Sequence, residues 1–64
     1  MESQYKILII DNHHDSLIYY QNFFKKHDFN VTIARNVLEG LEKLRDNKFQ
    51  VILANINLPQ NKCD

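Results

Sequence analysis

Runs of apolar residues broken by polar ones predict alternating strands and helices. Lys6–Ile10 is a short, continuous aliphatic run, which is typical of a strand covered on both faces. Leu17, Tyr20 and Phe24 then recur at spacings of three and four residues. That spacing predicts an amphipathic helix over residues 14–27, with its apolar stripe turned towards the core.

The second half of the chain repeats this order. In Phe29–Ala34, apolar residues alternate with Asn30 and Thr32, which predicts a second strand. A second helix is expected over residues 37–47, and Phe49–Ile56 is nearly all apolar, as expected of a third strand. The apolar face of the second helix is supplied by Val37, Leu38, Leu41 and Leu44.

Three local signals support these boundaries. Asn36 followed by Glu39 resembles a capping box at the start of the second helix. Gly40 inside that helix costs about 1 kcal/mol relative to Ala, which favours close packing against a neighbour, with local flexibility as the alternative. Asp28 stands where a helix C-cap glycine is usual, so it is expected to adopt the left-handed conformation.

The predicted order is strand, helix, strand, helix, strand within 64 residues, which is at most one domain. Connections of this kind are nearly always right-handed and produce a parallel sheet with helices on its faces. The predicted fold class is therefore α/β, and the five elements form one half of a doubly wound sheet.

Charge and cysteine content narrow the class of protein. Eight basic and eight acidic residues give a formal net charge of zero, which argues against binding to nucleic acid or a membrane surface through bulk electrostatics. The longest apolar run, Ile7–Ile10, is too short for a membrane span, and no signal-peptide pattern opens the chain. The single cysteine, Cys63, excludes an internal disulfide and a thiolate zinc site. We therefore expect a cytoplasmic protein without a cofactor.

Three segments in register resemble the N-terminal half of the response-regulator receiver domain, the CheY-like family with a flavodoxin-like fold. Residues 6–12 are similar to the family's first strand and acidic loop, and residues 34–41 to its entry into the second helix. Residues 51–59 are similar to its phosphoacceptor strand and the Leu-Pro turn that follows. On this resemblance, residues 1–64 form a single truncated receiver-like domain.

Two departures from the family pattern bear on phosphorylation. The phosphoacceptor Asp of the family corresponds to Asn55 here, and of two adjacent acidic residues only Asp11 remains, because the second position is Asn12. A carboxamide cannot form an acyl phosphate, and Mg²⁺ prefers clustered anionic oxygens. The family's Ser or Thr and its Lys on later strands would follow residue 64. The resemblance therefore implies a pseudo-receiver that is not an enzyme.

Two minor readings of the same region stay open. Asp11, His13 and His14 are ligand types that could hold a transition metal, although adjacent histidines usually point in different directions. Asn55 could in principle deamidate to Asp, although it is followed by Ile56 and not by the glycine that favours this reaction. Solvated loop residues and a hydrogen-bonded Asn are the simpler interpretations.

The resemblance also points to self-association, because the third strand of a complete receiver is paired on its far side by a fourth, and in these 64 residues it would be an open edge. A long apolar edge invites pairing with another strand, and two copies related by a two-fold axis would form a continuous sheet. The expected homodimer is completed either by pairing of third strands or by swapped elements. Its expected interface residues are Ile18, Tyr19, Val51, Leu53 and Ile56.

The leading functional hypothesis is a phosphorylation-independent half receiver that acts as a dimerisation or protein-interaction module in two-component-type signalling. A histidine kinase or another response regulator is the expected further partner, and neither nucleic acid nor a membrane is expected. The alternative is a fragment of a phosphoacceptor receiver whose remaining half lies elsewhere and in which Asp11 binds Mg²⁺.

Overall fold

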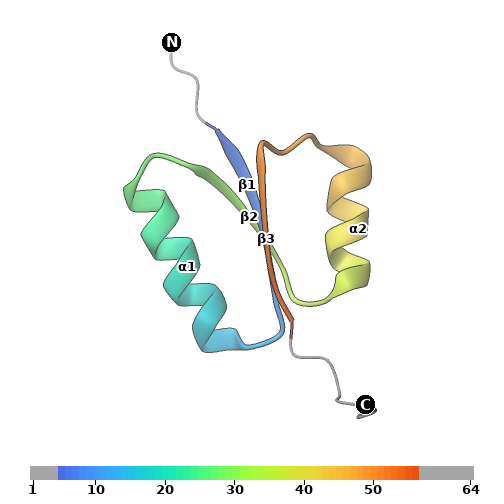
Figure 1. The fold of residues 1–64 in the computed structure, drawn as a ribbon, viewed down its shortest axis with the longest axis horizontal. Helices are drawn as coiled ribbons and strands as arrows, with labels where there is room; N and C mark the ends of the chain where they lie inside the picture. The colour runs from blue at the N-terminus through green and yellow to red at the C-terminus, as the bar shows by residue number, and fades with distance from the viewer. Residues whose placement is uncertain (1–4, 57–64) are drawn as a thin grey trace, which may run out of the picture.

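The computed structural model describes residues 5–56 and confirms the predicted α/β order (Figure 1). Its elements are β1 (Lys6–Asp11), α1 (His14–Lys26), β2 (Asn30–Ala34), α2 (Val37–Asp46) and β3 (Val51–Asn55). The third strand is shorter than predicted, because Phe49 and Gln50 precede it and Ile56 follows it. The predicted Leu58-Pro59 turn and Cys63 lie outside the described residues.

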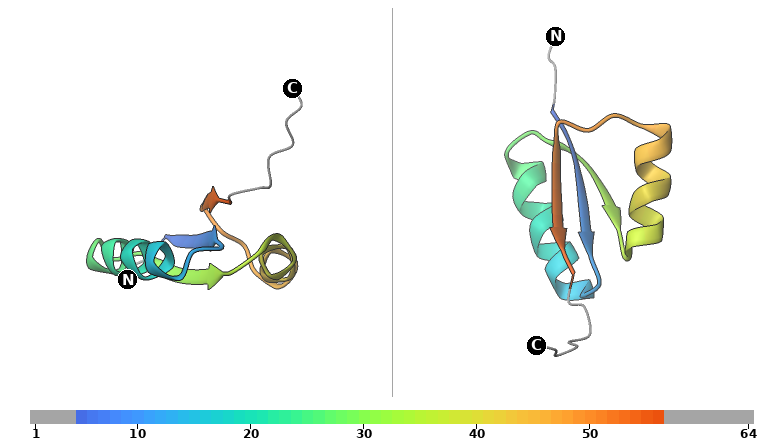
Figure 2. Two further views of the ribbon diagram at one scale, coloured as in Figure 1. Left: turned by 90° about the horizontal axis from the view of Figure 1, so that it is seen from below. Right: turned by 45° about the vertical axis from the view of Figure 1, so that its right-hand side comes forward.

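The three strands form one parallel sheet in the order β2-β1-β3, with a helix on each face (Figures 1 and 2). The central strand, β1, is therefore covered on both faces, as its uniform apolar sequence predicts. Ile7, Leu8 and Ile9 are each 0% exposed. Full burial of one such side chain contributes about 1.5–3 kcal/mol to the stability of the folded state. The side chains of β1 therefore form the centre of a small core.

Each face of the sheet has its own apolar cluster because side chains alternate along a strand. On the α1 face, Ile7 and Ile9 pack with Leu17, and the half-buried Tyr20 and Phe24 join them. This confirms the predicted helical stripe. On the α2 face the buried residues are Leu8, Ile10 and Ala34, with Phe49 and Ile56 packed against them.

The end of α1 is a Schellman motif built on a non-glycine residue. Asp28 N–H donates to the Lys25 carbonyl at 3.1 Å, and Phe29 N–H donates to the Phe24 carbonyl at 3.0 Å. Asp28 has a φ of 66°, so the predicted left-handed conformation is confirmed. The chain enters β2 directly after this turn.

The start of α2 follows the predicted cap with one difference. Asn36 Oδ1 accepts from the Glu39 N–H at 2.9 Å, as in a capping box. The Glu39 carboxylate, however, accepts from the N–H of Arg35, one residue before the cap, at 2.8 Å. Both bonds satisfy backbone donors at the point where the chain leaves β2.

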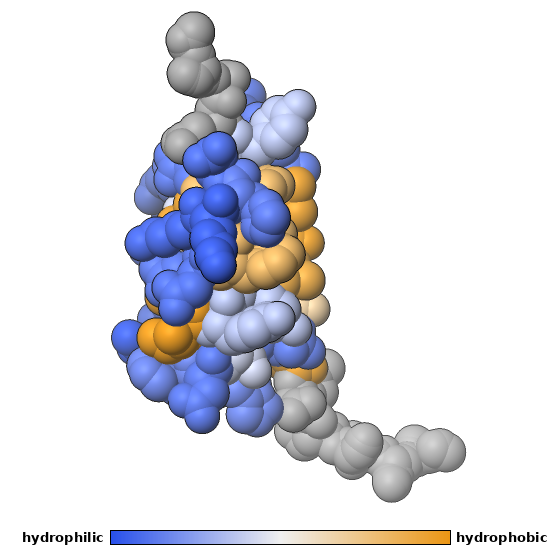
Figure 3. All heavy atoms as spheres, turned by 90° about the vertical axis from the view of Figure 1, so that its left-hand side faces the viewer, coloured by the Kyte–Doolittle hydropathy of each residue, from blue (hydrophilic) through white to orange (hydrophobic). Residues whose placement is uncertain are grey.

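The edge strand β3 is the least covered part of the sheet. Both helices pack over β1 and β2, and within residues 5–56 neither lies over β3. Val51 is 40% and Ile52 49% exposed. In Figure 3 hydrophobic residues gather along the right-hand edge of the view, where β3 lies, beside a mostly hydrophilic face.

The second helix also leaves its predicted apolar face exposed. Gly40 is the buried residue of α2, whereas the large apolar residues remain accessible. Exposed fractions are 47% for Val37, 72% for Leu38, 56% for Leu41 and 36% for Leu44. The sequence identified this face correctly, but the described residues do not cover it. No helix within residues 5–56 is long and apolar enough to cross a membrane.

Candidate functional site

The candidate site lies at the carboxyl edge of the sheet. Asp11 is the last residue of β1 and Asn55 the last residue of β3, and the two are partners in the parallel register. Parallel strands bring their carboxyl ends to the same edge of a sheet, where polar side chains can meet. The two positions that the resemblance singles out therefore stand side by side.

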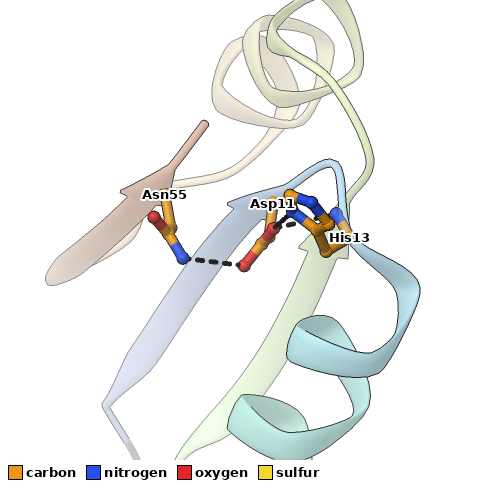
Figure 4. Close-up of polar contacts among 3 residues, drawn as sticks. All are labelled: Asp11, His13 and Asn55. Carbon is orange, nitrogen blue, oxygen red and sulfur yellow. Dashed lines mark hydrogen bonds and ion pairs between the residues drawn. The ribbon is translucent and has the colours of Figure 1, made fainter. Parts of the chain in front are cut away.

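Asp11 is the centre of the site. It is 0% exposed, and its two carboxylate oxygens accept hydrogen bonds from different elements. Oδ1 accepts from the His13 N–H at 2.9 Å, and Oδ2 accepts from Asn55 Nδ2 at 3.2 Å (Figure 4). His13 Nδ1 lies 3.6 Å from the same Oδ1. The carboxylate thus joins β1, the loop that starts α1, and β3.

The donors around Asp11 explain how a carboxylate is tolerated at this depth. Burial of an ionised carboxylate is costly unless hydrogen bonds compensate it. The His13 N–H is part of a local Asx turn, in which an Asp side chain accepts from the backbone two residues on. The Asn55 amide supplies the second donor across the sheet, which an Asp at this position could not do when ionised.

The three residues proposed as metal ligands do not form a cluster. His13 approaches Asp11, but no group of three or more His, Cys, Asp or Glu side chains within residues 5–56 is arranged to hold a metal ion. Asn12, the residue after Asp11, is exposed. Among the predicted polar residues, the structure therefore brings Asp11, His13 and Asn55 together and leaves His14 outside the site.

The expected interface residues lie on the surface to different degrees. Ile18 is 43%, Tyr19 65% and Val51 40% exposed. Leu53 and Ile56 are half-buried, because Leu53 packs against the α1-face cluster and Ile56 against the α2-face cluster. Leu53 and Ile56 therefore bury part of their apolar surface in the core of their own chain.

Sequence reasoning missed two features. The His13 backbone N–H is a principal partner of Asp11, and an Asp at a strand end three residues before a helix start was the available signal for it. The exposed apolar face of α2 was also missed, because periodicity identifies a face without revealing what covers it.

Comparison with known proteins agrees with the geometry of this edge. The family model described as the response regulator receiver domain matches residues 7–62, which is most of the chain. Neither the curated proteins nor the solved structures give a significant match. The match covers all three strands, both helices and the Asp11–Asn55 site, and the chain belongs to the response regulator receiver domain family.

Proposed function

We propose that this chain is a pseudo-receiver, which acts through protein contacts and independently of phosphorylation. Family membership supports a role in two-component signalling, since receiver domains are generally signalling modules and not enzymes. The observation that carries the proposal is the hydrogen bond from Asn55 Nδ2 to Asp11 Oδ2. At the phosphoacceptor position a neutral amide stands in place of the nucleophile. This amide donates a hydrogen bond to Asp11, the carboxylate that remains.

The Asp11–Asn55 bond bears on both requirements of phosphorylation in this family, a nucleophile and a bound cation. The Asn55 amide nitrogen has no basic lone pair with which to attack a phosphodonor. One oxygen of Asp11 is already engaged by that amide and the other by His13. A cation would have to displace both donors and would gain a single carboxylate, whereas Mg²⁺ bound to proteins relies on carboxylates and phosphate oxygens.

Incubation with a small phosphodonor and Mg²⁺ tests this directly. We expect the intact mass of the protein to stay unchanged, because the Asn55 amide cannot form an acyl phosphate and the Asp11 carboxylate is fully buried with both oxygens hydrogen-bonded. A receiver domain with its phosphoacceptor Asp intact, treated in parallel, serves as the positive control. Addition of a hydroxylamine-labile phosphate to this chain would contradict the proposal and favour the phosphoacceptor alternative.

The partners that we propose are a second copy of the chain, and a histidine kinase or another response regulator. Support for the homodimer comes from the outer edge of β3. Lys6 faces β3, since its N–H donates to Gln50 Oε1 at 2.7 Å and its carbonyl accepts from the Gln50 N–H at 2.9 Å. In the register that pairs Ile7 with Val51, the odd-numbered residues of β3 therefore bond to β1. The N–H and C=O groups of Ile52 and Ala54 consequently point away from the described sheet. They offer an antiparallel, two-fold pairing to a second β3.

Ile52→Pro tests strand pairing with little disturbance of the monomer. Proline removes an N–H that faces outwards and is tolerated on edge strands. We expect the dimer dissociation constant from sedimentation equilibrium to rise about tenfold or more. Ile52→Val keeps both the N–H and the β-branch and should dimerise as the parent does. Equal dimerisation of Ile52→Pro and Ile52→Val would rule out pairing through β3.

A further inference from the structure

The outer edge of β3 carries none of the features by which proteins protect a sheet edge. Edge strands that avoid a partner contain a charge, a proline or a bulge. The five residues of β3 read Val-Ile-Leu-Ala-Asn, and their register with β1 is continuous. Within residues 5–56 both helices pack over β1 and β2 (Figures 1 and 2). The edge is therefore open to a strand of another chain along its whole length.

The hydrogen-bonding groups of this edge allow β3 to pair with itself. The outward-pointing N–H and C=O groups belong to Ile52 and Ala54, which stand on either side of Leu53. In an antiparallel pair with its two-fold axis at Leu53, Ile52 exchanges hydrogen bonds with the partner's Ala54, and the reverse exchange follows by symmetry. Every residue of β3 is then paired. An axis at Ile52 or at Ala54 would leave one end of each strand unpaired.

The same register matches side chains on both faces of the sheet. On the α2 face the large Ile52 lies beside the small Ala54 of the partner. On the α1 face Leu53 meets the partner's Leu53, and Asn55 meets the partner's Val51. These odd-numbered pairs are the non-hydrogen-bonded ones, whose Cα atoms are only about 4.5 Å apart and whose side chains are in close contact.

This register brings a residue of the partner to the candidate site. Within one copy Asn55 is exposed, and its amide donates to the buried Asp11 carboxylate on the β1 side at 3.2 Å (Figure 4). The partner's Val51 would lie on the other side of Asn55 and on the same face of the sheet. Its methyl groups would exclude water from that side of the Asp11–Asn55 bond.

We propose that the partner's Val51 packs against Asn55 in the dimer and completes the cover of the Asp11–Asn55 bond. This inference rests on the homodimer proposed above, and it adds the register of that dimer and a coupling between the candidate site and association. An apolar neighbour is tolerated beside a neutral amide but is costly beside an ionised carboxylate, which loses water. The amide at position 55 therefore favours self-pairing, whereas a carboxylate there would oppose it.

Cysteine cross-linking tests the register. In a Cys63→Ser background, chains carrying Val51→Cys and chains carrying Asn55→Cys should form a mixed disulfide when they are combined under mild oxidation. A Cα separation of about 4.5 Å suits a disulfide. Neither chain should cross-link alone, since each position lies about 13 Å along the strands from its own copy. Intact mass distinguishes the mixed product from the self-linked ones.

Leu53→Cys and Ile52→Cys are a matched pair for the position of the two-fold axis. Leu53→Cys should cross-link with its own copy, whereas Ile52→Cys should not, because the partner's Ala54 lies opposite it. Self-linking of Ile52→Cys, or self-linked products of Val51→Cys and Asn55→Cys in the same yield as the mixed one, would overturn the register and leave the homodimer standing. A parent chain that stays monomeric in sedimentation would overturn the homodimer and this contact together.

Asn55→Asp and Asn55→Ala test the coupling. Both variants lose the hydrogen bond to Asp11, but only Asn55→Asp places an ionised group beside the partner's Val51. At pH 7, with circular dichroism confirming that each chain is folded, sedimentation equilibrium should give Asn55→Asp a dissociation constant about tenfold or more above that of Asn55→Ala. Equal dissociation constants would show that the partner does not cover position 55.

Discussion

Asn55→Asp should lower the free energy of unfolding at pH 7 by about 2 kcal/mol. The substitution removes the hydrogen bond from Asn55 Nδ2 to the buried Asp11 carboxylate and places a second carboxylate about where the amide was. Like charges at this spacing repel, although the exposure of residue 55 to solvent screens part of the effect. In a domain of this size the Tm should fall by about 10 °C.

The sign of the pH dependence follows from the same repulsion. The repulsion requires both carboxylates of the variant to be ionised, so the deficit should be largest at neutral pH. As the pH falls, one carboxyl group takes up a proton and can donate to the other, so the difference from the parent protein should shrink. Urea denaturation of both proteins at pH 7 and near pH 4 measures this change.

A neutral control separates charge from hydrogen bonding in this experiment. Asn55→Ala loses the same bond without adding charge, so it should be less destabilised at pH 7 and should show no relief at low pH. Mg²⁺ should recover part of the stability of Asn55→Asp, which has two carboxylates to offer, and should leave the parent and Asn55→Ala unaffected. A variant as stable as the parent at pH 7 would show that Asn55 is not compensating Asp11.

Gly40→Ala should destabilise the protein by up to about 2 kcal/mol even though alanine favours helices. The new Cβ would lie 2.5 Å from Ile10 Cδ1 and 3.0 Å from Ile10 Cγ1. Ile10 is 7% exposed, so it has little room to move aside. Overpacking of a core costs about 1–3 kcal/mol. That cost exceeds the gain of about 1 kcal/mol from helix propensity.

A double-mutant cycle tests whether Ile10 causes the destabilisation expected of Gly40→Ala. Ile10→Val removes the Cδ1 methyl group that the new Cβ would strike, at a cost of about 0.5–1.5 kcal/mol by itself. In that background Gly40→Ala should be neutral or stabilising, because the propensity gain is then largely unopposed. Chemical denaturation of the four proteins supplies the coupling energy. Additive effects would show that α2 does not approach β1 as closely as the structure indicates.

The fold was largely predictable because each element has its own periodic signal. The uniform run in β1 predicts burial on both faces, and Ile7, Leu8 and Ile9 are indeed fully buried. Capping by Asn36 and the left-handed Asp28 were likewise readable from residue chemistry. Strand ends were less predictable, since Phe49 is apolar like the strand although it precedes β3, and Ile56 is apolar although it follows β3.

The site was only partly predictable. Asp11 and Asn55 could be paired from the resemblance, but the donor role of the Asn55 amide depends on register and side-chain rotamers, which no local pattern encodes. The exposure of Leu38 was beyond sequence reasoning for another reason. Apolar spacing predicts that a face is buried against something, and only the packing shows that nothing within residues 5–56 covers it.

The bond between Asp11 and Asn55 has a consequence for how β3 is aligned. The strand is apolar on both faces, with Val51 and Leu53 on one side and Ile52 and Ala54 on the other. A slip of one residue would exchange these faces at little hydrophobic cost, so burial alone specifies the alignment weakly. After such a slip Asn55 would project from the opposite face and leave Asp11 without its cross-strand donor. Asn55 thus selects one alignment of the edge strand among several of similar apolar burial.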